Sequence, residues 1–218
     1  MKNRADHPAV HVVGIDVGGP GKGYHAVALS GGRYLVHLAT KDVEYLSHWC
    51  AEVQRSQVVA VDAPCCWSKN GRARPAERAL IERGIHCFST PTRERAAVHP
   101  KGYFDWMLQG ELIFEKLRDN FPLCSRWPEI RQRYCFETFP HAVSWQLRGG
   151  NALASQKRSQ RRQLLSEAGI KVSPLSNIDL VDAALCALTA WHAVSGKPCQ
   201  SFGDGETGLI IVPEQADI

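Results

Sequence analysis

The chain has 218 residues, 44% of them hydrophobic and 22% charged, with a net charge of +4 at pH 7. These values are ordinary for one soluble globular domain with a sizeable core, and the mild positive charge permits nucleic-acid binding without indicating it strongly. The first ten residues lack the apolar segment of a signal peptide, and we find no apolar run with the length of a membrane span. We therefore expect a cytoplasmic protein that does not enter a membrane.

The eight cysteines form no CxxC pair, which excludes a zinc knuckle and a disulfide framework as obvious readings. Without a secretion signal, we expect reduced and mostly buried thiols. A zinc site built from Cys65, Cys66, His86 and Cys87 is an alternative, although the ligand spacing is irregular.

The first forty residues predict three antiparallel strands in succession. Residues 11–17 are rich in β-branched side chains and end in a glycine-rich turn, residues 24–30 form the second strand, and residues 33–40 form the third. A helix over residues 42–54, capped by Asp42, leads to an apolar strand at 57–62. This return after a meander predicts a mixed sheet with helices packed on it.

The second half alternates helices with short strands. A short helix over residues 75–83 precedes a helical insertion at about 93–130. The remaining predicted elements are a strand at 134–137, helices at 155–168 and 178–194, and a late strand at 209–212. We expect one domain over residues 1–218.

Two aspartates end apolar strands, Asp16 in VVGIDVGG and Asp62 in VVAVDAP. Each has a plain structural explanation, since Asp often accepts hydrogen bonds from a following turn. Ligand sites of α/β sheets, however, lie just outside the carboxyl ends of strands. Two aspartates at neighbouring strand ends would be able to share a cation.

A second acidic pair, Asp179 and Asp182, lies one turn apart on the apolar helix NIDLVDAALCAL. Asp179 is in the first helical turn, where a negative charge favours the helix dipole. Asp182 has apolar neighbours nearly all round, and a buried carboxylate needs a partner or a metal. Asp16, Asp62 and Asp182 are therefore the predicted metal ligands.

Two further acids are weaker candidates. Glu137 in YCFETFP is either a ligand and catalytic residue or a partner of the arginine-rich segments. Glu206 lies in the glycine-rich segment GDGETG, which we interpret first as an ordinary turn before a strand. The alternative is that Glu206 lies at the edge of the metal site.

Two basic segments are candidates for nucleic-acid binding, although such runs are usually solvated faces. The predicted contacts are Arg72, Arg74, Arg78, Lys157, Arg158, Arg161 and Arg162.

Taken together and in order, GIDVGG, AVDAP, RPAERALIERGI with STPT, ETFPHAVSWQL, DLVDAALCAL and GDGETGLIIVP resemble the domain-of-unknown-function family 429 over nearly the whole chain. That family is described as predicted nucleases with a ribonuclease H fold. The resemblance implies a ribonuclease H-like mixed five-stranded sheet, an antiparallel meander followed by parallel strands, flanked by helices. In the wider superfamily, which includes Holliday-junction resolvases, acids on the first strand, the fourth strand and a late helix form the catalytic set. These correspond to Asp16, Asp62, and Asp179 with Asp182.

The resemblance implies a nuclease that hydrolyses phosphodiester bonds of DNA or RNA with one or two Mg²⁺ or Mn²⁺ ions held by carboxylates. Two alternatives stay open. An actin-like nucleotide-binding phosphotransferase or hydrolase shares the core sheet but normally duplicates it, and a non-catalytic module would bind nucleic acid through the basic faces. The sequence leaves the oligomeric state undetermined.

Overall fold

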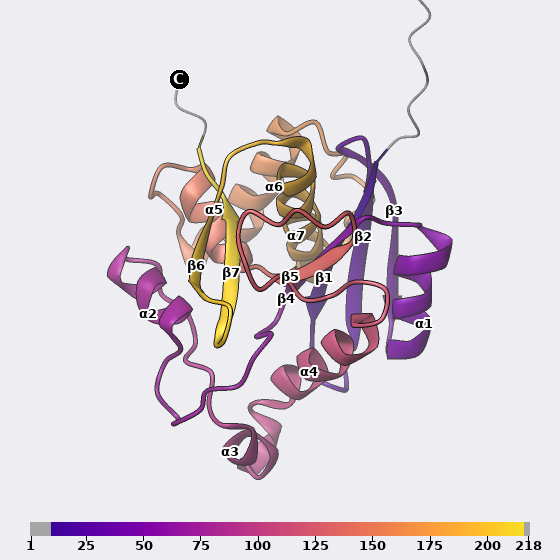
Figure 1. Ribbon diagram of the computed structural model, residues 1–218. Helices are drawn as coiled ribbons and strands as arrows, with labels where there is room; N and C mark the ends of the chain where they lie inside the picture. The colour runs from indigo at the N-terminus through magenta and orange to yellow at the C-terminus, as the bar shows by residue number, and fades with distance from the viewer. Residues whose placement is uncertain (1–9, 216–218) are drawn as a thin grey trace, which may run out of the picture.

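The computed structural model describes residues 10–215, in which helices cover both faces of one mixed sheet (Figure 1). The strands are β1 (His11–Val17), β2 (Tyr24–Ser30), β3 (Arg33–Thr40), β4 (Val58–Asp62), β5 (Tyr134–Glu137), β6 (Cys199–Asp204) and β7 (Gly208–Pro213). The helices are α1 (Val43–His48), α2 (Pro75–Glu82), α3 (Arg93–Ala97), α4 (Asp105–Leu117), α5 (Pro140–Leu147), α6 (Lys157–Glu167) and α7 (Ile178–Ser195).

The strand order across the sheet is β3-β2-β1-β4-β5-β7-β6. Strands β1, β2 and β3 pair antiparallel, while β4 and β5 continue from β1 in parallel. This is the predicted ribonuclease H-like arrangement, a meander followed by parallel strands. Two strands extend the five-stranded core: β7 joins β5 in parallel, and β6 closes the sheet antiparallel to β7.

The sequence interpretation missed two elements. Helix α5 begins at Pro140, which we had expected only to stop the preceding strand, because proline fits the first turn of a helix as well as the end of a strand. Strand β6 escaped notice because it is an edge strand with a single buried residue, Phe202, so its sequence has no apolar alternation.

Each face of the sheet has its own hydrophobic core. Helix α7 contributes to one core with α5 and α2, and helices α1 and α4 contribute to the other (Figure 1). By length and composition, α7 would be able to cross a membrane, which corrects our expectation that no apolar run has that length. Here, however, 61% of its residues are buried inside the domain, which is the behaviour of a core helix.

Helix α7 lies unusually close to the central strand because β1 has a glycine where the two meet. A Cβ atom placed on Gly14 would lie 2.0 Å from the Ala187 nitrogen and 2.1 Å from the Ala183 oxygen. No side chain fits in that space. The close approach brings the N-terminal half of α7 over the ends of β1 and β4.

The start of α7 is fixed by a side-chain cap. Asn177 accepts a hydrogen bond of 2.8 Å from the Leu180 nitrogen, and Gly196 ends the helix in the left-handed conformation at φ 70°. Asp179 therefore lies in the first turn, as predicted, and Asp182 lies one turn further in.

Candidate metal and catalytic site

Asp16 and Asp62 are neighbours across the parallel pair β1 and β4, where they occupy the same register position. The apolar residues before them are buried in the sheet, and both carboxylates lie partly buried at its carboxyl edge. The register of these two parallel strands therefore brings two carboxyl groups side by side.

Burial and the charges of neighbouring acids disfavour the ionised forms of these two carboxyls. Burial is the main cause that raises the pKa of Asp16 well above its usual range, and the charges of Asp62, Asp182 and Asp179 add to it in that order. Burial also raises the pKa of Asp62 to about 8, with Asp182 the next contributor. The four acids therefore interact electrostatically as one acidic cluster.

Asp182 is buried on α7 and, within residues 10–215, forms an ion pair with Arg161 of α6 alone. The Arg161 Nη1 atom donates to the Asp182 carboxylate, and both side chains are about nine-tenths buried. Burial raises the pKa of Asp182, and Arg161 partly offsets that rise. The Arg161 Nε atom is buried and has no hydrogen-bond acceptor among the described residues, so one donor of the guanidinium is left unsatisfied there.

Asp179 is more exposed and pairs with Lys22, whose Nζ lies 3.1 Å from Oδ1. Lys22 belongs to the glycine-rich turn between β1 and β2, which begins two residues after Asp16. The sequence interpretation did not assign a role to this lysine or to Arg161 in the acidic cluster. For Lys22 the available signal was its position in GGPGKG, six residues beyond Asp16.

The carboxylate oxygens of Asp16 and Asp62 are ligands suited to a hard divalent cation rather than to a lysine or arginine side chain of this protein. Asp16 and Asp62 supply oxygen ligands and have no cationic side chain bonded to them among residues 10–215. In the described part of the chain, no three acids, histidines or cysteines converge as a ready-formed metal cage. The reason is visible at the third acid, since Asp182 is engaged by Arg161 and would have to exchange this partner for a metal. Asp16 and Asp62 fit a cation as they stand.

Glu137 takes the second of its two predicted roles, as a partner of an arginine. Arg74 donates to its carboxylate in a bidentate pair, with distances of 2.9 Å from Nη1 to Oε2 and 2.6 Å from Nη2 to Oε1. The Cys65 nitrogen donates to the same carboxylate at 2.9 Å. Both side chains of the pair are almost fully buried. Glu137 therefore lies beside the acidic cluster but is fully engaged away from it.

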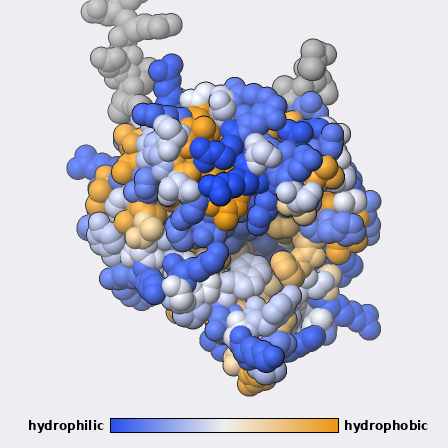
Figure 2. Space-filling view, turned by 180° about the vertical axis from the view of Figure 1, so that it is seen from behind, coloured by the Kyte–Doolittle hydropathy of each residue, from blue (hydrophilic) through white to orange (hydrophobic). Residues whose placement is uncertain are grey.

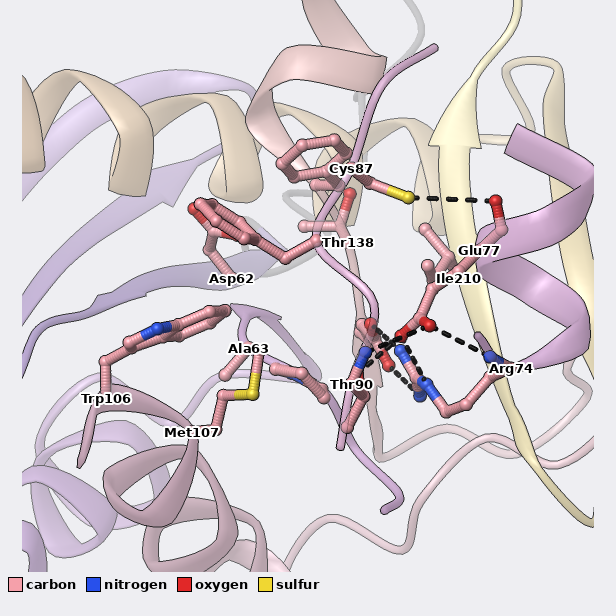
Figure 3. Close-up of a pocket in the computed structure, with 14 residues that line it drawn as sticks. Asp62, Ala63, Arg74, Glu77, Cys87, Thr90, Trp106, Met107, Thr138 and Ile210 are labelled. Carbon is pink, nitrogen blue, oxygen red and sulfur yellow. Dashed lines mark hydrogen bonds and ion pairs between the residues drawn. The ribbon is translucent and has the colours of Figure 1, made fainter. Parts of the chain in front are cut away.

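The prediction that Arg74 contacts nucleic acid disagrees with its position. Its Nε atom donates to Glu77 at 2.8 Å, and Glu77 in turn accepts from the backbone and hydroxyl of Thr90 (Figure 3). The side chain is 2% exposed. A guanidinium that is buried and bonded to two carboxylates is not placed to bind a phosphate at the surface.

The other predicted basic contacts divide into exposed and engaged side chains. Arg162 donates to the carbonyl oxygens of Leu175 and Val172, so it holds the segment before α7. Arg161 is buried against Asp182 and does not lie on the surface. The exposed members of the set are Arg72, Arg78, Lys157 and Arg158.

Cysteines and Glu206 add no metal ligands in the described residues. All eight cysteines are free, four of them buried and four partly buried, and those considered for zinc do not gather into a site. Glu206 lies in the turn between β6 and β7, where its backbone nitrogen donates to Asp204 and its carboxylate lies 3.8 Å from Lys69. Its position is that of an ordinary surface turn.

Comparisons with known proteins give a family and two structural likenesses. The family model described as "Protein of unknown function (DUF429)" matches residues 14–207. No curated protein matches the chain significantly. A Thermus thermophilus RuvC structure resembles it at 17% identity with a TM-score of 0.47, covering 86% of this chain and 97% of that chain. T. thermophilus RuvC in complex with Holliday junction substrate gives 17% identity and a TM-score of 0.46, covering 86% and 96%.

Proposed function

The chain belongs to the DUF429 family, and for it we propose a divalent-metal-dependent nuclease that hydrolyses phosphodiester bonds of DNA or RNA. The observation that supports the proposal is the pairing of Asp16 and Asp62 at the ends of β1 and β4, with Asp182 of α7 near enough to raise the pKa of both. Two partly buried carboxylates side by side at one edge of a sheet, with no cationic side chain of residues 10–215 bonded to them, are a functional-site signal, because such charges are costly to keep.

Asp16 and Asp62 would hold one or two Mg²⁺ or Mn²⁺ ions, and Asp182 would join them when it leaves Arg161. When bound, such ions lower the pKa of a water nucleophile and stabilise the leaving oxygen of a phosphodiester. The protein's own residues keep the carboxylates in place: the register of β1 and β4 fixes the first pair, and the Gly14 contact fixes the third acid relative to them.

Arg161 has a second task in this proposal. In the metal-free site it neutralises Asp182. Once a cation takes over that role, the guanidinium is free to interact with the phosphate, for which its planar donor set is well suited. Lys22 stands in the same relation to Asp179 at the more exposed side of the cluster.

The exposed side chains of Lys157 and Arg158 on α6, and of Arg72 and Arg78 near α2, would contact the phosphate backbone. Each such contact releases counterions, so binding would weaken as salt rises. The modest net charge of +4 predicts a local rather than a global electrostatic attraction.

The test is cleavage by the purified full-length protein with Mg²⁺ or Mn²⁺, on single-stranded, duplex and branched DNA and on RNA. Asp16→Asn and Asp62→Asn should abolish cleavage while the far-ultraviolet circular dichroism spectrum stays unchanged. Asp119→Asn alters an exposed aspartate at the end of α4 and is the matched control. Cleavage that persists in both site variants would show that it does not come from the Asp16 and Asp62 site and would overturn the proposal. Metal-dependent ATP hydrolysis without cleavage would favour a phosphotransferase or nucleotide hydrolase.

A further inference from the structure

A small cavity opens directly beside Asp62 and has aromatic walls. It offers about 50 Å³ to water-sized molecules and is lined by Phe88, Trp106, Met107, Thr138 and Phe139 as well as by Asp62. In Figure 3, Asp62 and Trp106 lie on one side of the cavity, and Arg74, Glu77 and Thr90 lie on the other. The buried ion-pair network therefore forms a rigid wall opposite the acid and the indole.

Three aromatic rings continue from this cavity onto the surface. Phe88 makes edge-to-face contacts with Trp106, at 6.2 Å between ring centroids, and with Tyr103, at 6.4 Å. Phe88 is 60% exposed and Tyr103 is 54% exposed. We call Phe88, Tyr103 and Trp106 the aromatic ledge.

Core packing does not explain this exposure. Large aromatic side chains gain stability by burial, and Phe88 and Tyr103 leave more than half of their surface in water. The surface seen from behind is mostly hydrophilic, with hydrophobic residues in small separate groups (Figure 2). A ring cluster that borders an acidic site is therefore a candidate contact for a ligand.

A basic hollow adjoins the cavity and shares Arg74 with it. It has a volume of about 190 Å³ and is lined by Lys69, Arg72 and Arg78, all of which are exposed. Asp62 of the acidic cluster and two rings of the aromatic ledge line the cavity, and the basic hollow lies next to it, with Arg74 between them. An aromatic surface next to a basic one matches a nucleic-acid strand, in which flat apolar bases alternate with negative phosphates.

We propose that the aromatic ledge stacks one or two unpaired bases of a strand whose phosphate would lie at the cation held by the acidic cluster, and that the basic hollow holds a flanking phosphate. This inference rests on the proposed nuclease function and adds a substrate class to it: single-stranded or branched nucleic acid. The cavity is much smaller than the roughly 300–1,000 Å³ of sites that enclose a ligand, so the bases lie on the exposed ring faces. Bases inside an intact duplex are already stacked and cannot reach the ledge.

The test measures binding in an Asp62→Asn background, in which cleavage does not interfere. The probes are a single-stranded DNA that carries 2-aminopurine and its fully paired duplex. In the Asp62→Asn background, Phe88→Ala and Tyr103→Ala should each weaken single-strand binding about 5- to 150-fold, the range expected when one stacked base is lost. They should also reduce the quenching of 2-aminopurine fluorescence, whereas Phe88→Tyr should retain it.

Tyr45→Ala is the matched control, because Tyr45 is an exposed aromatic residue on α1 (46% exposed) and lies outside the ledge. It should bind single strands as the Asp62→Asn protein does. Removing the charge of Arg72 or Arg78 should lower the salt slope of binding by about one counterion each.

The outcomes separate the two proposals. If 2-aminopurine quenching depends on Phe88 but the protein cleaves no substrate with any metal, base stacking on the aromatic ledge would be supported and the nuclease function would be rejected. Cleavage together with Phe88→Ala and Tyr103→Ala variants that bind like the control would overturn the ledge and leave the nuclease. Equal losses on single strands and on duplex would also overturn it, because stacking requires unpaired bases.

Discussion

Asp16 and Asp62 share one register position on two adjacent parallel strands, and neither has a cationic side chain bonded to it in the described part of the chain. The fold therefore brings two like charges together and leaves their repulsion to be relieved by a proton or by a bound cation. Each of these alternatives has a measurable consequence.

Without metal, stability should fall as the pH rises from about 4 to about 8. The pKa of Asp62 is about 8 in the folded protein, against 3.8 for the free carboxyl, so the folded state keeps a proton that the unfolded state releases over this range. Thermal unfolding in EDTA across this range would measure the slope. Asp62→Asn should flatten it, and Mg²⁺ should raise Tm more at pH 8 than at pH 5.5. A wild-type slope equal to that of Asp62→Asn would contradict the pKa direction.

Arg161→Met should destabilise the metal-free protein by about 3–5 kcal/mol, because it leaves the buried carboxylate of Asp182 without its partner. Mn²⁺ should recover part of this loss, since a cation then replaces the guanidinium. Urea denaturation with EDTA and with Mn²⁺ measures both effects. Arg158→Met, at an exposed position on the same helix, should change stability by less than about 0.5 kcal/mol in either condition. Equal metal stabilisation of wild type and Arg161→Met would separate Asp182 from the metal site.

Glu137→Gln should affect the fold more than the metal. Loss of one charge from the buried pair with Arg74 should cost about 3–5 kcal/mol of folding free energy. Manganese titration followed by electron paramagnetic resonance should give the same affinity as wild type at a temperature where the variant is folded. A large loss of affinity in a stably folded variant would make Glu137 a ligand after all.

Gly14→Ala should destabilise the protein by at least about 2–3 kcal/mol, because its methyl group would clash with the backbone of α7. Gly19→Ala is the control, since no atom lies within 4 Å of the Cβ it would add. Urea denaturation compares the two. If Gly14→Ala were as stable as Gly19→Ala, the close packing of α7 on β1 would be wrong.

The parts of the site that the sequence predicted are those that depend on local pattern. Asp16 and Asp62 each end an apolar run, and the parallel pairing of those runs follows from the strand–helix–strand order. The paired spacing of Asp179 and Asp182 on an apolar helix likewise predicts their shared face. In each case a few consecutive residues carry the information.

The parts that escaped prediction depend on contacts between distant segments. Arg74 and Glu137 are 63 residues apart, and only the packing of α2 against the sheet makes them partners. Arg161 belongs to a strongly basic segment, in which an exposed side chain is the usual expectation. It is buried because α6 packs on α7. A run of basic residues does not reveal which of its members find a carboxylate, because neutralisation depends on tertiary position.

The Gly14 contact fixes the position of the α7 acid relative to the two acids on the strands. Side chains in a core can be exchanged for others of similar volume, and helices shift slightly when this happens. Where the backbone of a helix contacts the backbone of a strand, no side chain lies between them to be substituted. The distance from Asp16 and Asp62 to Asp182 therefore stays the same when the surrounding core residues change. A designer who transplants this acidic set to another sheet would need to move Gly14, Ala183 and Ala187 together with the carboxylates.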